Sequence, residues 1–503
     1  MVLLGLHPQG LRTACAVAVS AALHVALLLV IVSGGHDEGT QAGDEATGKL
    51  LLLHAADASR TESAELRRVE PAAIGATDAI RRVMLERPVP SLPGSSVSEE
   101  VDSRRPDDPV SEPAFTVLPE PVEPAVPPAP LPTRPIAQAE RAALVQQLEQ
   151  FAEELLENPR AEVSWERDGR RYSAVLIRER VSDGMALERA IAEVSAADGS
   201  QRLITRVGLN RLAFSQFTQM VDRWDPMVQL HDDEIVGRFH TNSRFNLLYD
   251  TRTAPKLLGK VTTAAGGFTA EGRGRRRHAD IFPGGVQTRT RPIRLPDSPG
   301  PFHWASQDDH AHVHEFTSDA RIRFLGSGGY TWRTRDAAQT QYVDEPTDRP
   351  VYLIAAPGVA LHVKGVVAGR VLVYSPHRIV IEGSLVYQSH PRDVPESGDY
   401  LGLVCDRYVE VASPRVTGRG DLEIHAAIYA GRRFLVRHID SPRAGTLHIY
   451  GSLTAGTLSA TEPRYATRIE YDPRFERVRP PGFPSTNRYE VDPQWRGEWA
   501  EVQ

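Results

Sequence analysis

The segment FHWASQDDHAHVHEF (302–316) carries three histidines that alternate with other residues. Alternate residues of a β-strand point to the same face, so we expect His310, His312 and His314 to share one face. Imidazole is a common ligand of Zn²⁺ and Cu²⁺, and the segment therefore predicts a metal site. Because same-face side chains stand about 7 Å apart on a regular strand, two of these histidines with a ligand from elsewhere, such as His303, fit one ion better than all three. A solvated, pH-responsive loop is the alternative interpretation.

Adjacent carboxylates occur at Asp232, Asp233 and Glu234 and again at Asp308 and Asp309. A glycoside hydrolase needs two carboxylates about 5–9.5 Å apart across a groove. Sequence neighbours on a strand point to opposite faces, so neither group meets that geometry by itself. The chain also contains no nucleophile elbow, phosphate loop, dinucleotide fingerprint or Cys-x-x-Cys motif. We therefore expect a protein that is not an enzyme and needs no cofactor.

A basic run, GRGRRRH (272–278), contains Arg273, Arg275, Arg276 and Arg277. Its glycines predict a mobile loop, and its charge would let it contact anionic lipid headgroups or glycans. The whole chain, in contrast, has a net charge of −7. A nucleic-acid-binding protein needs a basic face to displace counterions, so the overall charge argues against that class.

These candidate residues follow a segment that is suited to a membrane. The 19 residues from Ala14 to Val32 are uncharged and mostly apolar. As a helix they would span roughly 28 Å, close to the hydrocarbon core of a bilayer. Arg12 precedes the segment and no Lys or Arg follows it until Lys49, which predicts a cytoplasmic N-terminus and an external remainder. A signal peptide cleaved near Gly34 is the alternative, although signal peptides have shorter apolar regions.

Within this segment Ser20 and His24 lie four residues apart and would share one helix face. An ionisable side chain inside a membrane span is costly and points to a function. The arrangement Ser-x-x-x-His in a single N-terminal span resembles the membrane anchor of the TonB family. That resemblance implies that His24 faces motor subunits of the ExbB/ExbD kind and couples to proton flow. The alternative is a neutral His24 that hydrogen-bonds a neighbouring helix.

Residues 34–135 predict a disordered spacer, since they are rich in Ser, Asp, Glu and Pro and have no sustained apolar period. The spacer ends in LPEPVEPAVPPAPLPTRP (118–135). Such a tract favours polyproline II and can extend roughly 55 Å at about 3.1 Å per residue. A Glu-Pro-rich spacer strengthens the TonB resemblance, which is confined to residues 1–135. We expect the remainder of the chain to be held away from the membrane.

Residues 136–230 predict an amphipathic helix followed by a β-hairpin module. Apolar residues at Leu144, Leu148 and Leu155 follow a helical period within 136–159. Two alternating runs then flank Asp168-Gly169, and a second pair flanks Asp198-Gly199, which are both hairpin signals.

From residue 231 to 503 the pattern is mainly strand and turn. Four stretches share apolar residues at positions 1, 3 and 7; they begin at Leu361, Ile379, Leu422 and Leu447. Position 5 is small in each stretch, at Gly365, Gly383, Ala426 and Gly451. Positions 1, 3, 5 and 7 share one sheet face, and a small residue at a fixed place suits a tight bend. We expect an irregular β-solenoid, with a β-sandwich as the alternative.

Three segments carry a second resemblance: DDEIVGRFHTNSRFNLL (232–248), GKVTTAAG (259–266) and EPRYATRIEYDPRFERVRPPGFPSTNRYEV (462–491). They look like β-rich envelope proteins related to type IV pilus assembly, which implies a structural role and little chemistry.

Together these patterns predict a mainly β, single-pass inner-membrane protein with residues 1–33 as cytoplasmic stub and transmembrane helix. Its periplasmic body would be a binding or structural platform in envelope or pilus-type assembly, with the membrane, motor subunits and envelope or pilus proteins as partners. The alternative function is a β-helix lectin or enzyme that acts on cell-envelope glycan. A deep groove with converging carboxylates would favour the alternative.

Overall fold

The computed structural model describes residues 132–180, 184–198, 201–273, 277–300, 302, 311–345, 347–441 and 445–502. The chain divides into two units between Glu120 and Pro121, and every described residue belongs to the second. The predicted membrane segment with Ser20 and His24, and nearly all of the predicted spacer, lie outside the described residues. Within the described ranges, no helix is both long and apolar enough to cross a bilayer. The described part is mainly β, as predicted.

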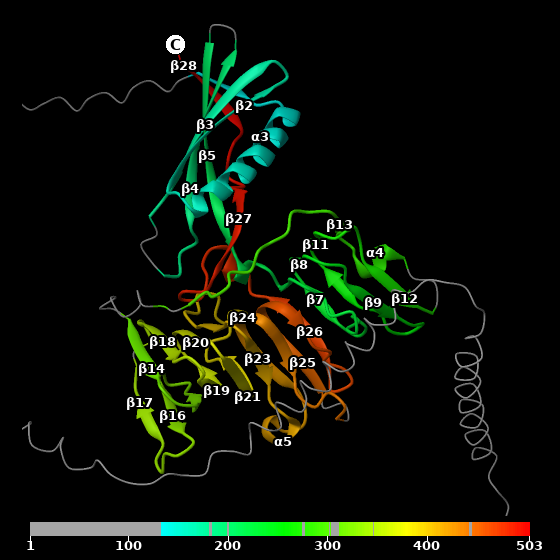
Figure 1. The fold of residues 1–503 in the computed structure, drawn as a ribbon, viewed down its shortest axis with the longest axis vertical. Helices are drawn as coiled ribbons and strands as arrows, with labels where there is room; N and C mark the ends of the chain where they lie inside the picture. Colours follow the sequence, from blue (N-terminus) through cyan, green and yellow to red (C-terminus); the bar gives the residue numbers. More distant parts are fainter. Residues whose placement is uncertain are drawn as a thin grey trace, which may run out of the picture. The chain divides into compact units, whose positions relative to one another are not determined.

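One antiparallel sheet, here called the sheet module, carries the long helix (Figure 1). Its strands run in the order β1-β28-β5-β4-β3-β2, and β27 also pairs with β5. The bounds are β1 (Thr133–Pro135), β2 (Arg160–Arg167), β3 (Arg170–Arg178), β4 (Arg189–Asp198), β5 (Gln201–Ala213), β27 (Ser485–Val491) and β28 (Glu498–Val502). The module therefore takes strands from both ends of the described chain.

Both predicted hairpins are confirmed. Strands β2 and β3 pair antiparallel from Arg167 and Arg170 outward, and the turn residues Asp168 and Gly169 have φ of 51° and 74°. Two successive residues with positive φ match the type I′ turn, which suits the twist of the flanking strands. Strands β4 and β5 pair down to Asp198 and Gln201, although the two residues between these lie outside the described ranges.

Helix α3 (Gln138–Phe151) continues as the 3-10 turn η1 (Ala152–Leu156) and ends before Pro159. Leu144, Leu148 and Leu155 are buried together with side chains of the sheet, which confirms the amphipathic pattern. Full burial of one such leucine contributes about 1.5–3 kcal/mol. The helix therefore closes one side of the sheet module.

The other described strands pair mainly in parallel and form what is here called the stack (Figure 1). The strands before residue 300 are β6 (Gln219–Val221), β7 (Glu234–Val236), β8 (Phe239–Thr241), β9 (Asn246–Tyr249), β10 (Lys256–Leu258), β11 (Val261–Thr263), β12 (Thr269–Gly272) and β13 (Val286–Gln287). Those after it are β14 (His312–Phe316), β15 (Ala320–Phe324), β16 (Tyr330–Thr334), β17 (Gln341–Val343), β18 (Pro350–Ala355), β19 (Ala360–Val367), β20 (Arg370–Ser375), β21 (Arg378–Tyr387), β22 (Tyr400–Cys405), β23 (Tyr408–Val411), β24 (Leu422–Val436), β25 (Gly445–Leu458) and β26 (Tyr465–Tyr471). The short helical pieces are η2 (Phe214–Gln216), α4 (His278–Ile281), α5 (Pro414–Thr417) and η4 (Pro473–Glu476).

The parallel pairs trace three ladders. The first runs β14-β18-β20-β22-β24-β25-β6-β8-β11-β13. The second runs β15-β19-β21-β23-β24. The third runs β19-β21-β24-β25-β26-β7-β10. Strand β24 belongs to all three ladders and β25 to the first and the third, so successive layers of the stack cover one another.

The order of layers in the stack differs from the order of the chain. The segment from β14 to β26 builds one part, and the earlier segment from β6 to β13 continues it beyond β25 and β26. The two segments meet in one composite layer, where β6 and β26 both pair with β25. The stack is in turn inserted into the sheet module, because it begins after β5 and ends before β27. Ala213 and Ser485, at the two junctions, are partners in the antiparallel β5–β27 pair.

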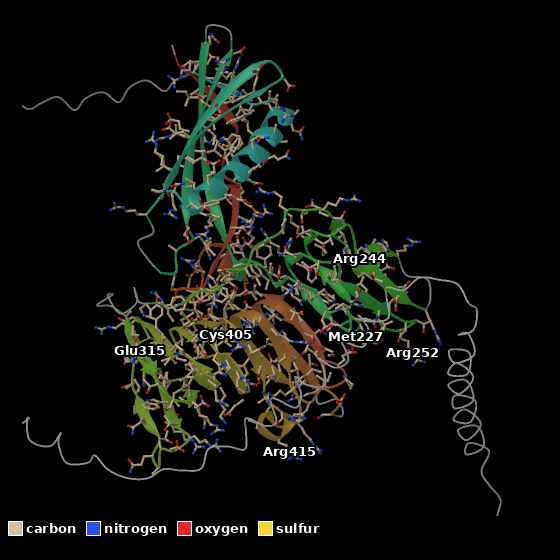
Figure 2. All side chains as sticks on the ribbon, in the orientation of Figure 1. Met227, Arg244, Arg252, Glu315, Cys405 and Arg415 are labelled. Carbon is tan, nitrogen blue, oxygen red and sulfur yellow. The ribbon has the colours of Figure 1, made fainter. Side chains whose placement is uncertain are left out.

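The sequence repeat corresponds to in-register pairing. Leu361 pairs with Ile379, and Leu422 pairs with Leu447, and all four side chains are buried in the interior of the stack. Cys405 lies in the same interior as a free thiol, and burial raises its pKa to about 12 (Figure 2).

Position 5 of the repeat requires a glycine in two of the four stretches. Gly365 and Gly451 have φ of 118° and 140°, and an added Cβ would lie 2.4 Å and 2.1 Å from a backbone oxygen of the neighbouring strand. Gly383 has no positive φ, and its Cβ would meet only the side chain of Lys364 at 3.6 Å. The expectation of a tight bend is therefore right for two glycines and wrong for Gly383.

Candidate functional site

A groove lies on the outer side of the second ladder, with a volume of about 360 Å³. The parallel register places Arg321, His362 and Val380 side by side on successive strands, and Glu410 continues the row. We call this surface the arginine groove; its polar lining is Asp319, Arg321, His362, His377, Arg378, Glu382, Glu410, Ser413, Arg437 and His438. A second hollow of about 310 Å³ shares Asp319, Arg321 and His362 with it and adds Arg335.

The first of two buried carboxylates in the groove is Glu382, which is 8% exposed. It accepts a hydrogen bond from His362 Nδ1 at 2.8 Å and one from Arg321 Nε at 3.1 Å. The bond from His362, together with Arg321, outweighs burial and lowers the pKa of Glu382 to about 2. Glu382 is therefore an ionised acceptor that holds its two neighbours in place.

The second carboxylate, Glu410, is only 3% exposed. Its Oε2 accepts a hydrogen bond from Arg437 Nε at 2.6 Å, and its Oε1 lies 3.2 Å from Arg378 Nε. The bond to Glu410 also raises the pKa of Arg437. Buried charges need such partners, because leaving one unpaired costs several kcal/mol.

In all three arginines of the groove Nε is the atom nearest a carboxylate; Arg321 and Arg437 donate a hydrogen bond from it, whereas Arg378 makes an ion pair without one. Their side chains remain 48% (Arg321), 34% (Arg378) and 45% (Arg437) exposed. Among the described residues, no hydrogen bond engages their Nη atoms. A guanidinium presents its Nη donors as a planar fork that matches carboxylate and phosphate oxygens. Chemically, the groove can bind oxyanions or accept hydrogen bonds from hydroxyl groups.

The structure brings two of the three predicted metal ligands together. His312 and His314 lie on one face of β14, where both contact the hydroxyl of Tyr330, at 3.3 Å and 2.7 Å. His312 Nδ1 also lies 2.8 Å from a carboxylate oxygen of Glu345. His310 and His303 lie outside the described residues, and the residues that are described contain no group of three or more His, Cys, Asp or Glu arranged for a metal. The metal site at His310, His312 and His314 stays a prediction.

The predicted basic run is described only in part. Arg273 and Arg277 are exposed, and Arg275 and Arg276 lie outside the described residues, so the contact of these four arginines with an anionic surface stays a prediction.

Of the acidic neighbours, Asp308 and Asp309 lie outside the described residues, and Asp232, Asp233 and Glu234 have separate partners. Asp232 pairs with Arg468 at 3.1 Å, whereas Glu234 lies 3.6 Å from Lys256. Asp233 accepts the backbone N–H of His231 at 2.9 Å.

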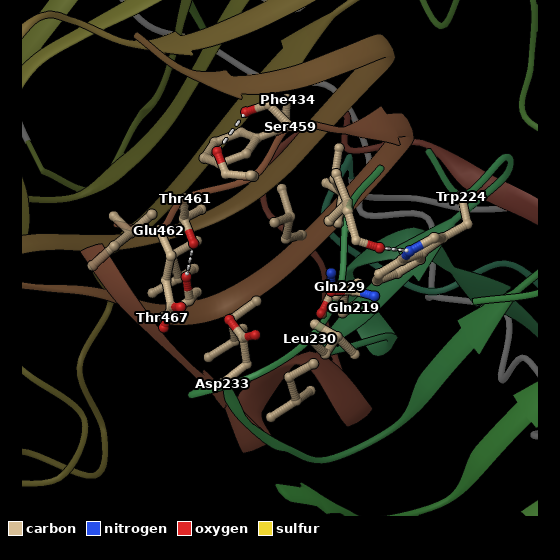
Figure 3. Close-up of a pocket in the computed structure, with 18 residues that line it drawn as sticks. Gln219, Trp224, Gln229, Leu230, Asp233, Phe434, Ser459, Thr461, Glu462 and Thr467 are labelled. Atoms are coloured by element: carbon tan, nitrogen blue, oxygen red, sulfur yellow. Dashed lines mark hydrogen bonds between the residues drawn. The ribbon is translucent and has the colours of Figure 1, made fainter. Parts of the chain in front are cut away.

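Asp233 borders a cavity inside the stack at the composite layer (Figure 3). The cavity is mostly apolar, and Trp224 lies across it from Asp233 and Thr467. Burial raises the pKa of Asp233 to about 6. The cavity volume is about 60 Å³. That space suits a few water molecules and is well below the roughly 300 Å³ at which ligand pockets begin. Of these two hollows, we therefore take the arginine groove as the candidate functional site.

Sequence reasoning missed the arginine groove because its residues come from distant segments. One usable signal exists in the repeat, where His362 occupies position 2 and Glu382 occupies position 4. Even positions point away from the interior, so ionisable residues there mark a charged outer face. Arg321 belongs to no repeat stretch, and only the parallel register places it beside His362.

Comparison with known proteins gives little further information. No protein-family model matches the chain, and no curated protein matches it. Among solved structures, the chain is similar to the crystal structure of the competence-associated pilin ComZ from Thermus thermophilus. The identity is 12% and the TM-score is 0.25, over 73% of this chain and 95% of that chain.

Proposed function

We propose that this chain is a membrane-tethered binding platform of the cell envelope, with its β-rich body in the periplasm. One observation carries the proposal: the stack is inserted into the sheet module through Ala213 and Ser485, which are cross-strand partners. Because both covalent connections leave from adjacent positions, the helix-backed sheet supports the stack as a base. We interpret the stack as an irregular β-solenoid whose three ladders give it rigid outer faces.

The tether follows from the sequence. The apolar segment 14–32 would be the anchor, and the proline-rich tract would extend the reach of the body by roughly 55 Å. Ser20 and His24 would face motor subunits of the ExbB/ExbD kind. A tethered base that carries a large rigid surface suits envelope or pilus-type assembly.

The arginine groove is the contact surface in this proposal, and its electrostatics favour binding over hydrolysis. A glycosidase acid must hold a proton near neutral pH, which requires a raised pKa. The pKa of Glu382 is instead lowered to about 2 by its bonds to His362 and Arg321. Glu410 is occupied on both oxygens by Arg378 and Arg437. These carboxylates position arginines.

The tether is tested by alkaline extraction of envelopes and by protease treatment of spheroplasts that contain the full chain. We expect the chain to stay with the membrane and its body to be cleaved from the periplasmic side. Recovery of a chain trimmed near Gly34 that is soluble without detergent would contradict the proposal.

The insertion is tested by replacing residues 214–484 with Asn-Gly, a turn that joins antiparallel strands directly. Since Ala213 and Ser485 are partners, the sheet module should retain β27, β28 and its own core, and the shortened chain should stay membrane-bound. It should also lose every envelope component that the full chain captures by crosslinking. Capture that survives the excision would place the contact surface outside the stack.

A further inference from the structure

We infer that the arginine groove binds an extended oligosaccharide that bears acidic groups, laid across the strands of the second ladder. This inference rests on the proposed function, because it names the ligand class of the platform.

The groove is too long for a single small anion. Its residues come from the adjacent strands β15, β19, β21 and β23 and from the end of β24. Neighbouring strands lie about 4.8 Å apart, so five strands span roughly 19 Å. A phosphate ion or one sugar would fill only part of this length, and the geometry therefore favours an oligomer.

The free donors suit acidic groups on that oligomer. The guanidinium groups of Arg321 and Arg437 donate Nε hydrogen bonds to the buried carboxylates, and Arg378 lies beside Glu410 as an ion pair at 3.2 Å. The Nη forks are thereby pre-organised, which lowers the entropy lost when a ligand binds. A uronate carboxylate and a sugar phosphate present the same pair of oxygens to such a fork. The structure assigns this shared chemistry to the groove.

Apart from the carboxylate of Asp319, which accepts the backbone N–H of Ala360 at 2.8 Å, the remaining lining suits a sugar backbone. His362, His377, His438 and Ser413 offer hydrogen-bonding groups for hydroxyls. Small or aliphatic residues lie between them: Gly358, Ala360, Val380, Ala412 and Val416. These allow the C–H face of a sugar ring to approach closely, and their small size keeps the groove open.

Two other classes of polyanion fit less well. A peptide that binds by strand addition needs a free sheet edge, yet β19, β21 and β23 are paired on both sides. Single-stranded nucleic acid is held by stacking on aromatic side chains. The aromatic side chains among the described residues that line the groove are the imidazoles of His362, His377 and His438; none is Phe, Tyr or Trp.

The experiment titrates the full chain in detergent with defined probes by isothermal calorimetry. The acidic probes are hexagalacturonate and a phosphate-bearing oligosaccharide of similar length. The comparison probes are neutral maltohexaose, hexaglutamate, inorganic phosphate and phosphatidylglycerol vesicles. We expect binding of an acidic oligosaccharide and at least tenfold weaker binding of every comparison probe. Equal binding of a neutral sugar, the peptide, phosphate or vesicles would overturn the inference.

Variants locate the site. Arg378→Gln and Arg437→Gln should each weaken binding of the acidic probe by about tenfold or more, the usual effect of losing a charged hydrogen bond. Arg437→Lys retains the charge opposite Glu410 but removes the fork, so it should fold normally and still weaken binding. Arg323→Gln is the matched control, since Arg323 is an exposed residue of β15 outside the groove. Unchanged affinity in Arg437→Lys would overturn the inference.

Failure of this inference differs from failure of the proposed function. If no acidic oligosaccharide binds but the chain still captures an envelope component through the stack, the ligand class is wrong and the platform stands. If the chain is also released from the membrane without detergent, both are wrong.

Discussion

Replacement of Gly451 by Ala tests the register of the stack. The backbone of Gly451 has φ of 140°, which costs an L-residue about 1–3 kcal/mol. An alanine Cβ would lie 2.1 Å from the backbone oxygen of Ala426, so β24 and β25 must separate locally. Loss of one or two ladder hydrogen bonds adds about 0.5–1.5 kcal/mol each. We expect Gly451→Ala to lower the free energy of unfolding by about 3–5 kcal/mol.

The matched control is Gly383→Ala, at the same position of the repeat. Its Cβ would meet only Lys364 Cβ and Cδ, both at 3.6 Å. An unstrained Gly→Ala change that meets no closer atom alters the free energy of unfolding by at most about 1 kcal/mol. The assay is denaturant unfolding of the purified protein followed by tryptophan fluorescence, with the slope compared as well as the midpoint. Equal effects of the two substitutions, or a loss below about 1 kcal/mol for Gly451→Ala, would refute the pairing of Ala426 with Gly451.

Four further predictions concern ionisable residues. Glu410→Gln should lower the free energy of unfolding by about 2 kcal/mol, because Arg378 and Arg437 lose their charged partner while solvent partly screens them. Glu179→Gln, at an exposed residue, should change the free energy of unfolding little. Equal losses from the two substitutions would contradict the role of Glu410. Burial lowers the pKa of His240 to about 4, so the unfolded state binds more protons than the folded state between about pH 6.5 and 4. As the pH is lowered through that range, the free energy of unfolding should fall by up to about 1.4 kcal/mol per pH unit. The pKa of Asp233, raised to about 6, acts in the opposite direction, because the folded state binds the extra proton between about pH 6 and 4. Asp233→Asn should therefore steepen the loss of stability measured by unfolding at pH 7, 5.5 and 4.5. A shallower loss of stability would refute this assignment. His24→Ala should abolish co-purification of motor subunits while the chain stays in the membrane, and unchanged co-purification would end the coupling proposal.

Local patterns predicted the local parts of the fold. Asp168-Gly169 predicts a hairpin because this two-residue turn, with positive φ at both positions, joins two strands of alternating apolar and polar residues. The spacing of Leu144 and Leu148 identifies the buried side of α3. The insertion of the stack has no such signal, because Ser485 pairs with Ala213 from far along the chain. The sequence of β27 has the pattern of an ordinary strand and does not indicate which strand it pairs with.

The arginine groove was hidden for a related reason. Its two carboxylates, Glu382 and Glu410, look in the sequence like ordinary surface residues of alternating strands. Their burial depends on Arg321 and Arg437, which belong to other layers of the stack. The histidines of β14 are conspicuous in the sequence because they are only two residues apart, whereas the residues of the arginine groove come from different layers of the stack.

The central claim is that the tethered body contacts an envelope ligand through the arginine groove. The most direct measurement is photocrosslinking in intact cells from a photoreactive residue at Val416, which lines the groove and is 49% exposed. Val394, which is 45% exposed and outside the groove, is the control position. We predict a glycan-bearing adduct in the membrane fraction from Val416 alone, and its loss in Arg437→Lys. Equal adducts from both positions, or none from Val416, would contradict the account.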